Sequence, residues 1–110
     1  MRARATAILA AAATFISGTS QAFAGGDLVS GREKAQQCVA CHGPGGVAPN
    51  PTFPHLAGQN AAYLEIQLEY FKNGQRFHPV MTPVAEALTP QDIEDLSAYF
   101  SAVGPLADAP

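Results

Sequence analysis

The sequence has few cysteines, few basic residues and no long apolar run, and each shortage argues against a class of protein. Its two cysteines, Cys38 and Cys41, lie in one short motif, so none remains for a second zinc-ligand pair or for a disulfide elsewhere. Six lysines and arginines against nine acidic residues give a net charge of -3, which argues against a nucleic-acid partner. The longest apolar run is too short to span a bilayer.

The first 24 residues have the layout of a secretory signal peptide. Two arginines precede an apolar run over residues 5–16, and residues 22–24 (Ala-Phe-Ala) form a small-x-small cleavage site. We expect cleavage after Ala24, which leaves residues 25–110 as one domain in the bacterial periplasm. No cysteine follows closely enough to carry a lipid, so we expect no membrane anchor. The mature domain keeps four bases against nine acids, a net charge of -5, so its binding to a basic partner should weaken with salt.

Residues 38–42 read Cys-Val-Ala-Cys-His, the spacing typical of a c-type haem attachment site. Positions i and i+3 of a helix share a face, so both sulfurs can meet one edge of a porphyrin while His42 lies beneath the metal. The motif predicts one covalently bound haem c with His42 as an axial ligand. An 86-residue domain has a marginal core of its own, and a haem would add a large apolar plate to it.

Three other interpretations of the cysteine pair are weaker. A thioredoxin-like redox pair should follow a buried strand, but residues 31–37 are polar and helix-forming. A zinc site needs a second ligand pair, and the chain offers only the scattered His55 and His78. A disulfide between Cys38 and Cys41 would close too small a loop to stabilise the fold much.

The region that delivers the motif, residues 27–41, favours a helix. Either Asp27 or Ser30 can cap its start, since Ser30 and Glu33 fit a capping box, and the sequence does not decide between them. Gly31 is either a point of close approach to another helix or a glycine at a helix start.

Two further helices are predicted after a long loop. Asn60 caps one that runs to about Asn73, and Thr89 caps one that ends near Gly104. An apolar stripe that we interpret as core consists of Leu64, Leu68 and Phe71. A solvated face without catalytic role is expected for Gln91, Glu94 and Asp95.

The loop over residues 43–54 is rich in glycine and proline, and we expect neither helix nor strand in it. It makes sense as a segment that wraps a haem edge. The Pro54 carbonyl is the candidate acceptor for the His42 Nδ1 proton, although a plain loop proline is the alternative. Leu56 is a candidate for packing on the haem, or a generic core leucine. Arg76 can pair with a haem propionate, or lie in solvent.

Met81 is the candidate for the second axial ligand. Once Met1 is removed it is the only methionine, and it lies on what we predict to be a loop punctuated by prolines. Electron-transfer haems commonly take a thioether opposite the histidine. His55 and His78 are rival ligands, and His78 lies only three residues away from Met81.

On these residues the chain resembles the class I c-type cytochromes, most closely the single-haem cytochrome c553 type and one half of a cytochrome c4. The matching positions are residues 38–42, 54–59, 63–64, 67–68, 71–76, 81 and 88–100. The resemblance implies an all-α cytochrome c fold, with three main helices and loops wrapped around one covalently bound haem. It also implies that the first and last helices cross near Gly31, that His42 and Met81 are the axial ligands, and that the Pro54 carbonyl binds His42.

The function expected from these features is a soluble periplasmic one-electron carrier, not an enzyme, that works as a monomer with redox-partner proteins of unknown identity. Iron held by protein on both sides can pass electrons but leaves no open position for oxygen or peroxide. One alternative is the electron-accepting subunit of a periplasmic dehydrogenase or oxidase complex. Another is a haem-based gas sensor or peroxidase, which requires Met81 to be off the iron.

Overall fold

The structure is a computed structural model that describes residues 2–14 and 25–104. The predicted cleavage site after Ala24 lies outside the described residues. All regular structure in these ranges is helical. None of the helices formed by the described residues has both the length and the apolar character needed to cross a membrane.

The first helical run consists of α1 (Leu28–Lys34), a 3-10 turn η1 (Ala35–Cys38) and α2 (Val39–His42). Its cap is Asp27, whose carboxylate accepts hydrogen bonds from the backbone N–H groups of Val29 and Ser30. The alternative start at Ser30 is not used, because the Ser30 hydroxyl donates to Asp27 Oδ2 instead. Gly43, at φ 78°, ends the run, a conformation that a glycine adopts without steric cost.

The loop after α2 is held by backbone hydrogen bonds rather than by regular structure. It contains one short 3-10 turn, η2 (Pro44–Gly46), in which Gly45 has non-helical φ/ψ, and no longer helix or strand. The Gly46 carbonyl accepts from the N–H groups of Leu56 (2.8 Å) and Ala57 (3.1 Å), and Gly58 N–H donates to Phe100 O (2.8 Å). These bonds fold the loop back on itself and tie it to the last helix.

The two long helices agree with the sequence prediction. Helix α3 (Ala61–Asn73) is capped by Asn60 and ends at Gly74 in the left-handed conformation. Helix α5 (Pro90–Ala102) begins with a capping box in which the side chains and backbones of Thr89 and Asp92 bind each other reciprocally. Such caps satisfy backbone donors that the first helical turn leaves without partners.

Between these two helices lies α4 (Met81–Glu86), which the sequence analysis did not predict. The expectation that Met81 lies on a loop is therefore wrong, because Met81 is the first residue of a helix. The two prolines that suggested a loop do not prevent it. Pro79 precedes the helix, and Pro83 falls in its first turn, where a missing N–H breaks no helical hydrogen bond.

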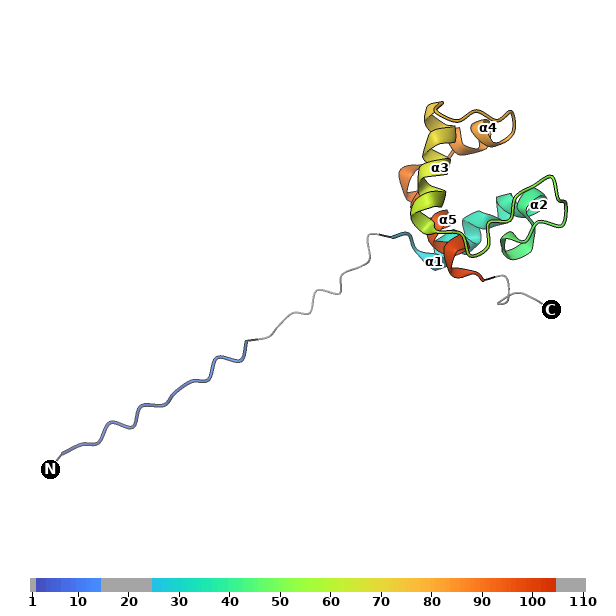
Figure 1. Cartoon of the computed structure of the whole chain (residues 1–110). Coiled ribbons are helices and arrows are strands. Elements are labelled where there is room, and N and C mark those ends of the chain that lie inside the picture. Colours follow the sequence, from blue (N-terminus) through green and yellow to red (C-terminus); the bar gives the residue numbers. More distant parts are fainter. Residues whose placement is uncertain (1, 15–24, 105–110) are drawn as a thin grey trace.

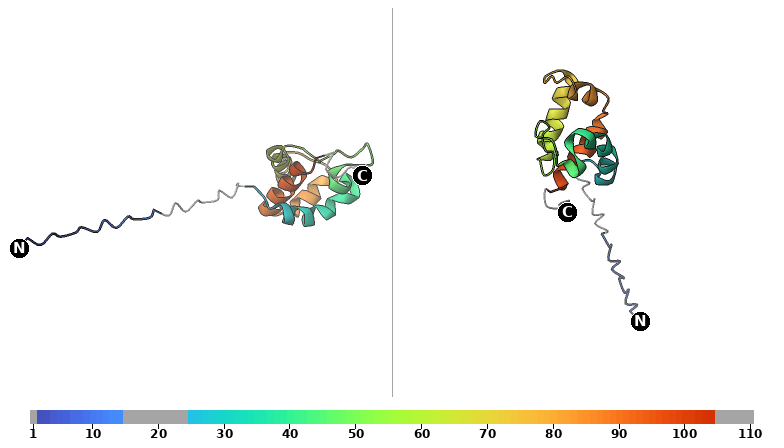
Figure 2. Two further views of the ribbon diagram at one scale, coloured as in Figure 1. Left: turned by 90° about the horizontal axis from the view of Figure 1, so that it is seen from below. Right: turned by 90° about the vertical axis from the view of Figure 1, so that its right-hand side faces the viewer.

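Helix α5 lies between α1 and α3, which do not pack substantially on each other (Figure 2, left). Helix α4 packs on α3, and in Figure 1 it faces α2 from the other half of the molecule. The crossing of α1 and α5 depends on Gly31, where a Cβ would come within 2.1 Å of Asp95 O and 2.7 Å of Tyr99 Cβ. Of the two interpretations of Gly31, a point of close approach between helices is therefore confirmed.

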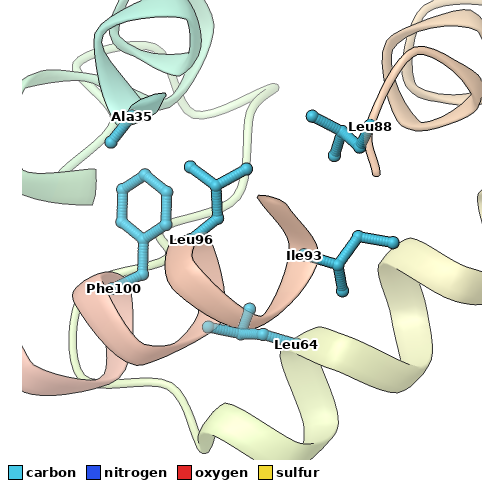
Figure 3. Close-up of a cluster of buried hydrophobic side chains, with 6 residues drawn as sticks. All are labelled: Ala35, Leu64, Leu88, Ile93, Leu96 and Phe100. Carbon is cyan, nitrogen blue, oxygen red and sulfur yellow. The ribbon is translucent and has the colours of Figure 1, made fainter. Parts of the chain in front are cut away.

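The core surrounds α5, which supplies half of its buried apolar side chains (Figure 3). Its members are Ala35, Leu64, Leu88, Ile93, Leu96 and Phe100. They come from the first helical run, from α3, from the segment after α4 and from α5. The core therefore joins the first helical run, α3, α5 and the segment after α4 at one place.

The prediction that Asp95 is solvated is wrong. Its side chain is only 3% exposed, and its carboxylate accepts from Lys34 Nζ (2.6 Å), from Gln91 Nε2 (2.8 Å) and from Asp27 N–H (2.7 Å). Lys34 also pairs with Asp92 at 2.8 Å. The Asp95 carboxylate lies where α1 and α5 cross at Gly31. Its contacts with Lys34 and with Asp27 N–H link the two helices.

Candidate functional site

A cavity of about 480 Å³ is lined by residues of η1 and α2, the loop after α2, and helices α3, α4 and α5. Cys38, Cys41, His42 and Met81 all line it, and α2 faces α4, the helix that begins at Met81 (Figure 1). Leu96 of α5 belongs to the same lining. The structure therefore brings the haem motif and the candidate second ligand, about forty residues apart in sequence, to one cavity.

His42 is held firmly at this cavity. The residue is 7% exposed, and its Nδ1 lies 2.9 Å from Pro54 O. Because a carbonyl only accepts hydrogen bonds, Nδ1 carries the proton and Nε2 keeps its lone pair for a metal. The contact exists because the loop turns back tightly, and at Gly43 a Cβ would lie 1.9 Å from Val47 O.

Cys38 and Cys41 are half-buried free thiols. Burial raises the pKa of the Cys38 thiol to about 11, and the neighbouring Cys41 adds to the rise. A catalytic redox pair needs the opposite shift, since its thiolate is the reactive species. The electrostatics of the site thus argue against the thioredoxin-like interpretation.

His55 and His78 also line the cavity, but the Nδ1 of each ring accepts hydrogen bonds from backbone N–H groups. Ala48 N–H donates to His55 Nδ1 at 2.8 Å. The N–H groups of Val80 and Met81 donate to His78 Nδ1 at 3.1 Å and 3.3 Å. Both rings therefore serve as acceptors that hold loops, a role that the sequence analysis did not assign to them.

Arg76 and Leu56, both singled out from the sequence, line the cavity too. Arg76 is exposed but has partners in the protein, because its Nη1 donates to Gln67 Oε1 (2.7 Å) and its guanidinium lies 4.5 Å from the centre of the Phe71 ring. Leu56 is partly buried and packs against the core cluster as well, so its two interpretations do not exclude each other.

Sequence reasoning missed the apolar wall of the site. Leu64, Leu68 and Phe71, interpreted as a plain core stripe, all line the cavity. No sequence signal separates the two cases, because a helix packed on a cofactor and a helix packed on another helix need the same apolar period. The one hint in the sequence is the small size of the domain, because a core this small suggests that part of the apolar stripe packs on a cofactor.

The cavity and its donors fit a haem. Its volume lies in the range of cofactor sites, which is about 300–1,000 Å³. Two thiols, an imidazole and a thioether line the cavity, together with many aliphatic and aromatic side chains. This donor set suits an iron porphyrin, whose ring is apolar and whose iron binds nitrogen and sulfur ligands.

Comparison with known proteins points the same way. The sequence profile described as cytochrome c matches residues 28–103. The chain is 43% identical over 79 residues to cytochrome c-554(548) of Halomonas halodenitrificans, which covers 69% of this chain and 95% of that protein. It is 45% identical over 83 residues to cytochrome c4 of Pseudomonas aeruginosa, which covers 76% of this chain and 41% of that protein.

One solved structure adds a larger assembly to the comparison. Thiosulfate dehydrogenase (TsdBA) from Marichromatium purpuratum matches with a TM-score of 0.68 and 40% sequence identity, over 76% of this chain and 20% of that one. The chain thus spans nearly the whole of one relative, less than half of the cytochrome c4 and a fifth of the TsdBA chain.

Proposed function

This chain belongs to the cytochrome c family, and from that premise we propose that it is a periplasmic one-electron carrier. The family has the all-α fold predicted from the sequence, and it binds haem c covalently through the spacing found at residues 38–42. The haem iron supplies the chemistry, which is the gain and loss of one electron.

The roles of the residues follow from the donors at the cavity. Cys38 and Cys41 would form the thioether links to the haem, and His42, through Nε2, and Met81 would bind its iron. The Pro54 carbonyl, 2.9 Å from His42 Nδ1, keeps the imidazole oriented. Arg76, at the same cavity, is placed to pair with a propionate.

The single observation that supports this proposal is that the haem motif and Met81 line the same cavity. An iron held by both His42 and Met81 would have no open position, so it could change charge without a change of ligands. That arrangement suits electron transfer and does not suit the binding of oxygen or peroxide.

A redox titration followed by optical spectra tests the proposal, with Met81→Ala as the variant. The wild type should titrate reversibly as a one-electron couple and show the long-wavelength sulfur-to-iron absorption band. Met81→Ala should lose that band and have a lower reduction potential, since the thioether favours reduced iron. A band that persists in Met81→Ala would contradict the ligand assignment, and carbon monoxide binding to the reduced wild type at neutral pH would favour the sensor or peroxidase.

A second candidate function is the electron-accepting subunit of a dehydrogenase. The similarity to the TsdBA chain favours it, because that structure is named as a thiosulfate dehydrogenase. Affinity purification from the native cell separates the two possibilities. A free carrier should elute as a monomer, whereas a subunit should co-purify with a larger catalytic chain.

Export is part of the same proposal. It rests on the signal-peptide pattern of residues 1–24. Amino-terminal sequencing of the purified protein should begin at Gly25, and cell fractionation should place it in the periplasm. A mature protein that still begins at Met1 would contradict export.

A further inference from the structure

At the start of α4, three consecutive backbone N–H groups donate hydrogen bonds to one residue, His78. The N–H groups of Val80 and Met81 donate to His78 Nδ1, and Thr82 N–H donates to the His78 carbonyl at 3.0 Å. The next residue, Pro83, has no N–H to place. His78 thus accepts every backbone hydrogen that this first turn offers.

The link also runs in the other direction. His78 N–H donates to Thr82 Oγ1 at 2.9 Å, and Thr82 is a buried residue, 9% exposed. The backbone of His78 is therefore fixed against a buried side chain, and its ring is held where Nδ1 can reach the two amides. Residues 73–80 are exposed. Arg76 is held against α3, and the bonds of His78 restrain the last residues before Met81.

From this geometry we propose that His78 is a positioning residue for the Met81 thioether. A methionine side chain has three rotatable bonds and little preference of its own, so the reach of its sulfur depends on where the backbone holds its Cα. His78 Nδ1 sets that position through the Met81 N–H. The inference rests on the proposed function, in which Met81 binds the iron, and gives His78 a role in the site without making it a ligand.

Competition by added imidazole measures the effect in the haem-loaded oxidised protein. Imidazole displaces Met81 from the iron, and the loss of the sulfur-to-iron band reports it. In His78→Ala the affinity for imidazole should rise about tenfold, which corresponds to the loss of one to two ordinary hydrogen bonds from the Met81-bound state. The reduction potential should fall at the same time, because the thioether spends less time on the iron.

Two conservative variants separate the acceptor atom from the bulk of the ring. In His78→Asn the side-chain oxygen can take the place of Nδ1, so imidazole affinity should stay within about twofold of the wild type. In His78→Gln the amide lies one carbon further out, so this variant should behave like His78→Ala. His55→Ala is the matched control. It removes a histidine that lines the same cavity but accepts its hydrogen bond from Ala48 N–H and not from Met81 N–H.

Wild-type imidazole affinity in both His78→Ala and His78→Gln would overturn the inference, as would equal affinities of His78→Asn and His78→Gln. The second comparison decides the question even if His78→Ala fails to fold. Failure of the proposed function has a different signature, since Met81→Ala would then keep the band and the potential of the wild type.

Discussion

The two sides of the haem cavity are held by different kinds of contact. On the His42 side, the contacts join residues far apart in sequence, such as Asp27 with Asp95 and His42 with Pro54. On the Met81 side, the hydrogen bonds at the start of α4 span at most four residues, from His78 to Thr82. The first side can open only when the helix crossing opens, whereas the second can open locally.

Burial follows the same division. His42 is buried, whereas Met81 is half-buried and follows an exposed segment, residues 73–80. A hydrogen bond from Lys72 Nζ to Leu88 O links α3 to the segment after α4. We therefore expect ligands from solution to replace Met81 long before His42 is disturbed, and changes on the His42 side to act on the whole fold.

The largest effect is expected from Cys38→Ala, which removes one covalent link between the haem and the His42 side. Without a firmly bound haem the cavity of about 480 Å³ fills with water, and the core of this small domain loses its largest apolar partner. We expect most of the free energy of unfolding, typically about 5–15 kcal/mol for a domain, to be lost. Urea unfolding followed by circular dichroism measures it.

Val39→Ala, inside the same motif, is the control and should keep both the haem and the cooperative transition. A Cys38→Ala protein with the spectrum and the unfolding curve of the wild type would show that the haem is not what completes the core.

Gly31→Ala should have the next largest effect. The added methyl group would lie 2.1 Å from Asp95 O, so α1 must move away from α5. Overpacking of this kind costs about 1–3 kcal/mol, and urea unfolding should show a loss of that size. The affinity of the folded oxidised protein for imidazole should not change, because the Met81 side does not depend on this crossing.

Gly74→Ala provides the contrast from the other side, since a Cβ there would meet nothing within 4 Å and only the left-handed backbone at φ 83° opposes it. Its cost should be nearer 1 kcal/mol. If Gly31→Ala altered imidazole affinity more than Gly74→Ala did, the division between the two sides would be wrong.

The parts of the structure that the sequence predicted well are those with local signals. The caps at Asn60 and Thr89 each fix a helix start within a few residues, and the haem motif depends on a fixed spacing. The Pro54 carbonyl also lies where the sequence proposed it, 2.9 Å from His42 Nδ1. These features need little knowledge of what packs against them.

What the sequence could not predict depends on contacts between distant segments. Asp95 looks like a surface acid on its own helix, and only the close crossing at Gly31 buries it beside Lys34. Helix α4 was missed because its two prolines suggested a loop, while the bonds that form its first turn come from His78. The cavity wall was missed because an apolar stripe does not reveal what it covers.

The smallest effect is expected at the ion pair that ties α1 to α5. The hydrogen bond from Lys34 and then that from Thr89 N–H lower the pKa of Asp92 from 3.8 to about 2. A carboxylate with a lowered pKa in the folded state stabilises the fold above pH 4, and this contribution is lost as the pH falls from about 4 to 2. Because Asp92 is partly exposed, with 24% of its side-chain surface accessible, the contribution should not exceed about 1 kcal/mol.

Urea midpoints of the wild type and of Asp92→Asn between pH 5 and pH 2 measure this contribution. The two proteins should differ most at pH 5 and converge toward pH 2, and added salt should reduce the difference. Asp95, whose pKa is also lowered by its bond from Lys34, should keep part of the pH dependence in the variant. Glu86→Gln, which removes a carboxylate from α4 on the Met81 side, is the control and should follow the wild type. A constant difference between wild type and Asp92→Asn from pH 5 to pH 2 would mean that this ion pair does not help to hold the His42 side together.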